Sequence, residues 1–123
     1  MKALMDYDEV LKYCLNKPCA VQTYPFDDVI LVMKVGTRMF ALFGGDKATG
    51  WINLKCDPDT SLILRKQFPA ITPGYHMDKR HWNTIKLDGS VPDEDIMMLA
   101  DMSYSLVVKG LSKAEKTELG LDL

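Results

Sequence analysis

The sequence predicts an α+β protein with one domain, residues 1–123, in which helices near both ends of the chain pack on an antiparallel β-sheet. Two stretches carry apolar residues at helical spacing, whereas the stretch between them, residues 21–56, alternates with a period of two. No linker or low-complexity segment interrupts the 123 residues, a length typical of one domain. The helices and strands are therefore expected to share a single core.

The first helix is expected to begin at Asp6, because Glu9 follows it in a capping-box-like arrangement. Apolar residues recur at helical spacing over residues 7–15, and Lys17-Pro18 then ends the helix. Cys14 lies on this apolar stripe, which indicates a buried structural thiol.

Residues 21–56 are expected to form an antiparallel meander of four strands. The predicted strands cover residues 21–26, 29–35, 38–43 and 51–56. They are separated by the turn-forming runs Asp27-Asp28, Gly36-Thr37 and Gly44-Gly45-Asp46. The second strand is apolar at nearly every position, so both of its faces need cover from helices or from another chain.

A second helix is expected to begin at Asp57-Pro58, where a capping residue precedes a proline. It must end near Phe68, because Pro69 follows. Pro73-Gly74 is typical of a turn, and residues 82–87 alternate as a strand that rejoins the sheet.

The last part of the chain is expected to be helical. Residues 90–95 form an acid-rich helix start, where negative charge complements the positive end of the helix dipole. Apolar residues at helical spacing over residues 96–107 predict a buried face, and Gly110 ends the helix. Ser112 with Glu115 predicts the cap of a final short helix.

The charge of the chain is small overall but locally uneven. The formal net charge is -2, which argues against a broad basic face that would clamp nucleic acid. Residues 60–87 nevertheless carry five cations and one acid, a local net charge of +4. The five cations are Arg65, Lys66, Lys79, Arg80 and Lys86, and the acid is Asp78.

The composition predicts a cytoplasmic protein that does not enter a membrane. No apolar run approaches the roughly 20 residues of a membrane helix, and the start of the chain is charged and amphipathic, unlike a signal peptide. The three cysteines cannot all pair, which favours reduced thiols.

No arrangement of residues predicts an enzyme, a metal site or a cofactor. The histidines and cysteines lack the Cys-x-x-Cys and His-Glu-x-x-His spacings of metal sites, and no serine or cysteine nucleophile has an assignable base. The glycine-rich residues 44–50 superficially resemble a phosphate loop, but strands flank them and the lysine precedes the last glycine. A hairpin is the better interpretation.

Residues 74–92, GYHMDKRHWNTIKLDGSVP, resemble the hallmark segment of the YjbR-like (MmcQ/YjbR) family. The opening helix, residues 34–41, the junction at residues 54–58 and Ser103-Tyr104 resemble the family in the same order. This resemblance covers nearly the whole chain. It implies a double-wing sheet and helix arrangement related to frataxin-like topology, and it implies DNA binding without catalysis. Iron binding does not follow from such a topology, because function resides in sites rather than in folds.

The resemblance carries the DNA-binding role to a basic and aromatic segment. Its residues are Tyr75, His76, Lys79, Arg80, Trp82 and Asn83, with Arg65 and Lys66 added because they belong to the same local excess of positive charge. Lysine and arginine neutralise phosphates, an aromatic ring can stack on a base, and asparagine can donate to a phosphate or a base edge.

Each of these residues also has a structural interpretation. A tryptophan that begins a strand is more often a packing residue than a platform for a base. Lys79 and Arg80 beside Asp78 are equally compatible with a solvated turn, and Arg65 and Lys66 with ordinary surface charges.

The alternative function is a protein-interaction or small-ligand module, including a homodimer. In that case a sheet face, or the helix that carries Met97, Met98 and Met102, would meet the partner. Cations gathered on one face would favour DNA. Their dispersal, or a pocket lined by Trp51, Trp82 and Tyr75, would favour a ligand or a partner.

Overall fold

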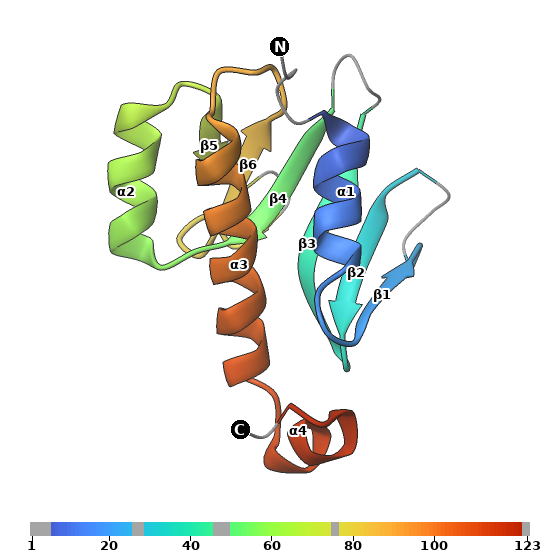
Figure 1. Ribbon diagram of the computed structural model, residues 1–123. Helices are drawn as coiled ribbons and strands as arrows, with labels where there is room; N and C mark the ends of the chain where they lie inside the picture. The colour runs from blue at the N-terminus through green and yellow to red at the C-terminus, as the bar shows by residue number, and fades with distance from the viewer. Residues whose placement is uncertain (1–5, 26–28, 46–49, 75–76, 122–123) are drawn as a thin grey trace.

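Four helices and six strands alternate along residues 6–25, 29–45, 50–74 and 77–121, the residues that the computed structural model describes (Figure 1). In chain order they are α1 (Tyr7–Leu15), β1 (Ala20–Thr23), β2 (Leu31–Val35), β3 (Arg38–Gly44), β4 (Trp51–Lys55), α2 (Pro58–Gln67), β5 (Ile71–Pro73), β6 (Trp82–Lys86), α3 (Asp93–Lys109) and α4 (Lys113–Leu119). The predicted α+β class is confirmed.

All of these strands join one antiparallel sheet, in the order β1-β2-β3-β4-β6-β5. The predicted meander is therefore confirmed from β1 to β4. Strand β6 rejoins the sheet as expected, and the structure places it beside β4. The register places Lys55 opposite Trp82 and Leu54 opposite Asn83. Side chains of opposed residues lie on the same face of a sheet, so these two pairs lie on opposite faces.

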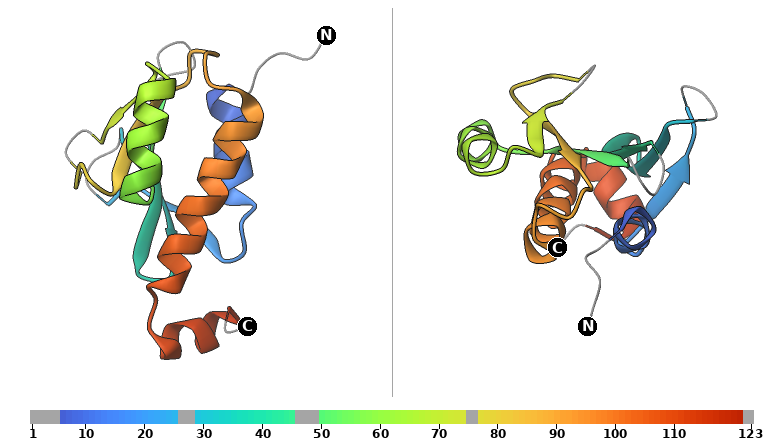
Figure 2. Two further views of the ribbon diagram at one scale, coloured as in Figure 1. Left: turned by 90° about the vertical axis from the view of Figure 1, so that its left-hand side faces the viewer. Right: turned by 90° about the horizontal axis from the view of Figure 1, so that it is seen from above.

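Helices α1 and α3 cover one face of the sheet, and α2 lies beside its β5 edge (Figure 2). The main core lies between this helix pair and the strands. Val10, Phe40, Phe43 and Ile52 are fully buried there. The one fully buried serine of α3, Ser103, donates to the carbonyl of Phe40 at 2.6 Å and accepts from the amide of Lys55 at 2.9 Å, so its hydroxyl is satisfied.

A second, smaller apolar cluster lies on the other face of the sheet. Val32, Leu42 and Trp82 are buried in it, with Met77 and Trp51 packed around them. Trp51 lies so close to Gly44 that a Cβ at this glycine would be 2.1 Å from the indole. The cluster explains why β2 is apolar on both faces: Leu31, Met33 and Val35 belong to the main core, whereas Val32 belongs to the second cluster.

The predicted helix caps are confirmed at three of the helices. Asp6 accepts from the amide of Glu9 at 3.0 Å, Asp57 from that of Thr60 at 2.9 Å, and Ser112 from that of Glu115 at 3.1 Å. Such caps satisfy amides that a helix start leaves without partners, and each stabilises the helix by about 1 kcal/mol.

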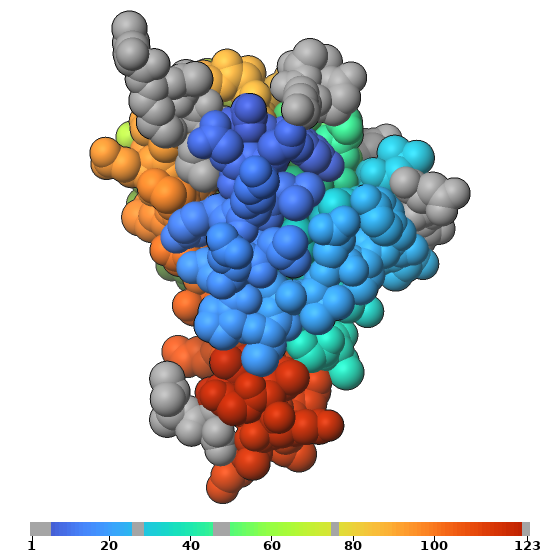
Figure 3. Space-filling model, turned by 45° about the vertical axis from the view of Figure 1, so that its right-hand side comes forward, coloured from blue at the N-terminus to red at the C-terminus, as the bar shows by residue number. Residues whose placement is uncertain are grey.

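Helix α4 forms a lobe at one end of the molecule, below α1 and the segment that leads into β1 (Figure 3). It has no buried residue of its own, but Glu115 accepts hydrogen bonds from the amide and the hydroxyl of Thr37 at 3.1 and 2.9 Å. Cys19 donates to the carbonyl of Leu119 at 3.3 Å. These contacts attach α4 to the β2–β3 turn and to the α1–β1 connection.

The structure corrects the predicted strands at several ends. The first predicted strand, 21–26, begins one residue earlier and ends at Thr23, with Phe26 outside the described residues. The strand predicted at 29–35 begins only at Leu31. Strand β5 was not predicted at all. Its Pro73 is tolerated because β5 lies at the edge of the sheet, where a missing amide disrupts little.

In the part of the chain that the structure describes, none of the helices is both long enough and apolar enough to span a lipid bilayer.

Candidate functional site

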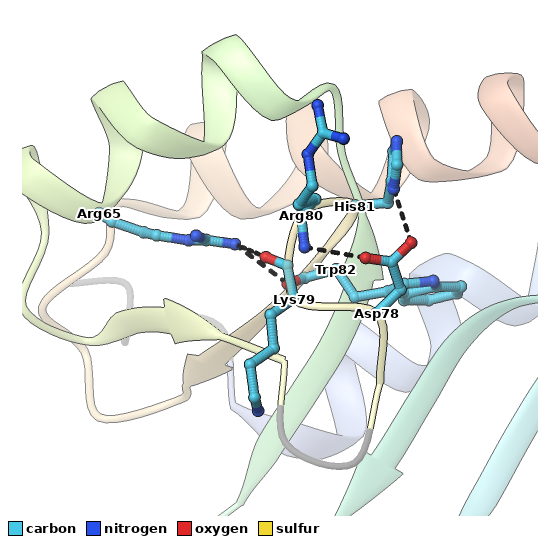
Figure 4. Close-up of polar contacts among 6 residues, drawn as sticks. All are labelled: Arg65, Asp78, Lys79, Arg80, His81 and Trp82. Carbon is cyan, nitrogen blue, oxygen red and sulfur yellow. Dashed lines mark hydrogen bonds and ion pairs between the residues drawn. The ribbon is translucent and has the colours of Figure 1, made fainter.

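Arg65 joins α2 to the turn segment, residues 77–82, that leads into β6. Its Nε donates to Oδ1 of Asn83 at 2.7 Å, and its Nη2 donates to the carbonyl groups of Lys79 and Trp82, the latter at 3.3 Å. Figure 4 shows the guanidinium reaching from the helix to these two carbonyl groups. One side chain from α2 therefore fixes both the backbone of the turn segment and the start of β6.

Asn83 lies beneath this contact and does not reach the surface. It is 2% exposed, its Nδ2 donates to the hydroxyl of Ser61 at 3.0 Å, and its Oδ1 accepts from Arg65. Both ends of the amide are thus used within the protein. The expectation that Asn83 itself would donate to a phosphate or a base does not fit this burial, and its role here is to support Arg65 from below.

The turn segment is also braced from within by Asp78. Its carboxylate accepts from the amide of Arg80 at 3.0 Å and from Nδ1 of His81 at 2.7 Å, and its carbonyl accepts from the amides of His81 and Trp82. The hydrogen bond from His81, followed by that from the Arg80 amide, lowers the pKa of the Asp78 carboxyl below its ordinary value. Asp78 therefore stays ionised and holds the turn closed.

Lys79 and Arg80 lie on the exposed part of this turn. Figure 4 shows their side chains extending on different sides of the Arg65 guanidinium. Nζ of Lys79 donates to the carbonyl of Gly74 at 3.1 Å. Lys79 and Arg80 therefore lie in a turn that is exposed to solvent, as the structural interpretation expected. Both of their cationic groups are at the surface.

The turn segment and the N-terminal part of α2 enclose a hollow of about 330 Å³, which we call the basic hollow. It is lined by Pro58, Asp59, Leu62, Arg65, Lys79 and Arg80. Three of these residues are cationic and one is acidic. Lys66 is exposed on the same helix but does not line the hollow.

Trp82 packs under the turn and is not a surface platform. It is 8% exposed and belongs to the second apolar cluster. Gly74 approaches it so closely that a Cβ at this glycine would lie 2.9 Å from Cβ of Trp82. The remaining two predicted site residues, Tyr75 and His76, lie outside the described residues.

The sequence pointed to Arg65 and Lys66 of α2, but not to two other residues of this helix that help to build the site. Ser61 holds Asn83 and Asp59 lines the basic hollow, and neither is among the predicted site residues. The available signal was the cap at Asp57, since it fixes the start of the helix. A helical spacing of four then places Ser61 and Arg65 on one face.

Within the ranges that the structure describes, no three His, Cys, Asp or Glu side chains come together in a way that could hold a metal ion. Cys14 is fully buried, and this burial raises the pKa of its thiol to about 12. Burial likewise raises the pKa of Cys56. Both thiols are therefore protonated near neutral pH, as expected of structural rather than reactive cysteines.

The fold and the basic hollow define a small α+β protein with a compact cationic site at the junction of a helix and a sheet. The family model YjbR matches residues 15–106 of this chain. The uncharacterized protein YjbR of Escherichia coli is 36% identical over 119 residues, which cover 97% of this chain and 100% of that protein. The chain belongs to the YjbR family.

Two further comparisons extend this result. The uncharacterized protein YbdF of Escherichia coli O157:H7 is 32% identical over 110 residues, or 89% of this chain and 90% of that protein. The crystal structure of protein DR2400 of Deinococcus radiodurans, with a DUF419 domain, is similar with a TM-score of 0.86 and 43% identity, covering 96% of this chain and 90% of that one. Because the Escherichia coli relatives are uncharacterized, membership of the family brings no activity with it.

Proposed function

We propose that this protein is a non-enzymatic DNA-binding module that contacts phosphates through the basic hollow. The observation that carries the proposal is that Arg65, Lys79 and Arg80, which come from two separate segments, line one hollow at the surface. Cations placed together in this way neutralise neighbouring phosphates and release the counterions that DNA holds, which is the main source of sequence-independent affinity.

Arg65 supports this binding by holding the turn segment in place. The turn is fixed before a phosphate arrives, by the contacts of Arg65 and Asp78, so binding need not order it. Lys79 and Arg80 lie at the surface, where they can reach a phosphate, and Arg65 adds positive charge behind them. Lys79 would exchange its hydrogen bond to the carbonyl of Gly74 for one to the phosphate. Lys66, on the same helix, is expected to add a peripheral contact.

The site is small, and the net charge of -2 adds no general attraction for DNA. Three phosphate contacts predict a slope of about -3 when the logarithm of the binding constant is plotted against the logarithm of the salt concentration. Affinity is therefore expected to be weak at physiological salt.

The test is fluorescence anisotropy of a labelled mixed-sequence duplex, titrated with protein from low to physiological salt. Substituting Lys79→Ala and Arg80→Ala together should weaken binding and make the slope shallower by about 2, one for each phosphate contact that is lost.

The matched control is Lys12→Ala with Lys113→Ala, which removes the same charge from exposed positions on α1 and α4. This control should leave the slope unchanged. Absence of binding by the native protein at low salt, or equal losses in the two double variants, would overturn the proposal.

A further inference from the structure

The outward side of α3 carries a stripe of residues at alternating spacings of three and four. The stripe consists of Asp95, Met98, Met102, Ser105 and Lys109. It lies on a different side of the helix from the buried residues Ile96, Leu99, Ala100, Ser103 and Val107. Its central residue, Met102, is half-buried, with its sulfur 3.8 Å from Sγ of the buried Cys56. The spacing of the stripe places the five residues along one side of the helix, with the apolar Met98 and Met102 between charged residues at the two ends. Met98 is large and apolar, yet it is 47% exposed to solvent.

A hollow of about 530 Å³ adjoins the C-terminal half of this stripe, and we call it the α3 hollow. Met102, Leu106, Val108 and Leu121 give it apolar walls, and Lys109 and Lys116 supply its positive charges. Its volume is in the range of sites that hold a small ligand, so it has room for a methionine side chain. The helix thus carries an exposed apolar side chain near one end and an apolar hollow near the other.

These features are complementary if two helices run antiparallel with Met102 at the centre. Met98 lies four residues before Met102. Leu106, which lies next to the stripe in the wall of the α3 hollow, comes four residues after Met102, so Met98 of one helix faces Leu106 of the other. Asp95 lies seven residues before Met102 and Lys109 seven residues after it, so the acid of one helix faces the lysine of the other. Antiparallel helices also bring opposite ends of their dipoles together.

We infer that two copies of this chain associate through α3 in an antiparallel pair, with Met98 of each copy seated in the α3 hollow of the other. The same patch is used by both copies, which is the isologous arrangement of a twofold dimer. Asp95 and Glu94 of one copy then lie near Lys109 and Lys116 of its partner. The occupant of the hollow is therefore a second copy, selected by charge as well as by shape.

This inference does not depend on DNA binding, and its test uses the full chain without DNA. The molecular mass is measured by sedimentation equilibrium over protein concentrations from about ten to several hundred micromolar, the range of weak dimers. The native protein should approach twice its chain mass of 13.9 kDa. Met98→Lys, which places a cation against Lys109 and Lys116, should stay at 13.9 kDa.

A charge exchange provides the decisive comparison. Asp95→Lys and Lys109→Asp should each weaken the dimer by roughly tenfold, because an attractive pair becomes a repulsive one at both symmetric positions. The double variant, Asp95→Lys with Lys109→Asp, should return to within about twofold of the native dissociation constant, since the attraction is restored with the signs exchanged.

Ile63→Lys is the control for adding a charge at an exposed apolar position. Ile63 is 65% exposed on α2, away from the α3 hollow, and its substitution should leave the dimer unchanged. Circular dichroism checks that every variant is folded. A native protein that stays monomeric over the whole range, a dimer that persists in Met98→Lys, or a charge exchange that fails to restore the dimer would each overturn the inference.

Discussion

Arg65 shows how one charged side chain can both line a candidate site and hold the fold together. Its guanidinium satisfies Oδ1 of the buried Asn83 and two backbone carbonyl groups of the turn segment. A buried amide oxygen that loses its donor carries a desolvation penalty, because no water replaces the lost hydrogen bond. Arg65 is therefore expected to matter for stability even in the absence of DNA.

Replacing Arg65→Ala should lower the free energy of unfolding by about 1–3 kcal/mol, because Oδ1 of Asn83 is left without its donor. The measurement is urea unfolding followed by circular dichroism. Lys66→Ala is the neighbouring control. Since Lys66 is exposed and lies outside the basic hollow, its loss should change stability by no more than about 0.5 kcal/mol. Equal effects of the two substitutions would contradict the structural role of Arg65.

At this scale the sequence identified charges but not their partners. Arg65, Lys79 and Arg80 stand out from sequence as a local excess, and three of the predicted cations do line one hollow. The burial of Asn83 could not be predicted, because it depends on Ser61, which is 22 positions away in the chain. Alternation alone leaves open which face of a strand is covered by a helix.

At the scale of elements, a polar contact joins α1 to α3. Asp101 of α3 accepts a hydrogen bond from the hydroxyl of Tyr13 at 2.7 Å and forms an ion pair with Lys17, whose ammonium also lies over the Tyr13 ring. Partial burial alone would raise the pKa of the Asp101 carboxyl. The hydrogen bonds from Lys17 and Tyr13 and the charge of Lys17 outweigh this effect, so the pKa lies below its ordinary value.

This lowered pKa predicts a stabilisation that depends on pH. A carboxyl whose pKa is lower in the folded state stabilises the fold above its unfolded pKa of about 3.9, and the contribution is lost as the pH falls through the folded value. Because Asp101 is 48% exposed, solvent screening limits the effect, and Asp101→Asn should lower stability at pH 7 by at most about 1 kcal/mol.

The measurement compares the urea midpoints of the native protein and Asp101→Asn at pH values from 7 down to 3. The difference between the two should be constant from neutral pH to about pH 5 and should shrink below about pH 4, where the native carboxyl becomes protonated. A difference that persists unchanged at the lowest pH would show that the charge of Asp101 does not stabilise the contact.

Elements with strong local signals were predicted well, and β5 was not. Capping residues and proline positions define the starts of α1, α2 and α4, because they act within a few residues of the chain. Strand β5 has three residues and ends in Pro73, so it has no alternation to recognise. It exists because Ile71 and Thr72 pair with β6, a contact that the local sequence does not encode.

At the scale of the whole molecule, the described strands form one continuous sheet, and α1, α2 and α3 pack on it or beside it. Helix α3 contacts β2, β3, β4 and α1, and α2 contacts β5. We therefore predict that the protein unfolds in a single transition, as small single domains usually do. Urea curves followed by circular dichroism and by tryptophan fluorescence should coincide. A helical signal that is lost at a separate urea concentration would indicate two independent folding units.

The order of β1 to β4 was predictable at this scale, because the turns between them force consecutive strands to neighbour one another. The second apolar cluster was only partly foreseen. The apolar character of β2 indicated that both faces need cover, but it could not identify Trp82 and Met77 as the residues that provide it.

The position of Trp82 gives the protein a built-in optical probe. The chain has two tryptophans, and Trp82 is enclosed beneath the turn that carries Lys79 and Arg80, with its carbonyl bonded to Arg65. An indole in apolar surroundings emits at shorter wavelength than one in water, so any movement that lifts this turn would shift the emission to the red. Opening of this turn, for example in urea, can thus be followed without a label, by the light that the protein itself emits.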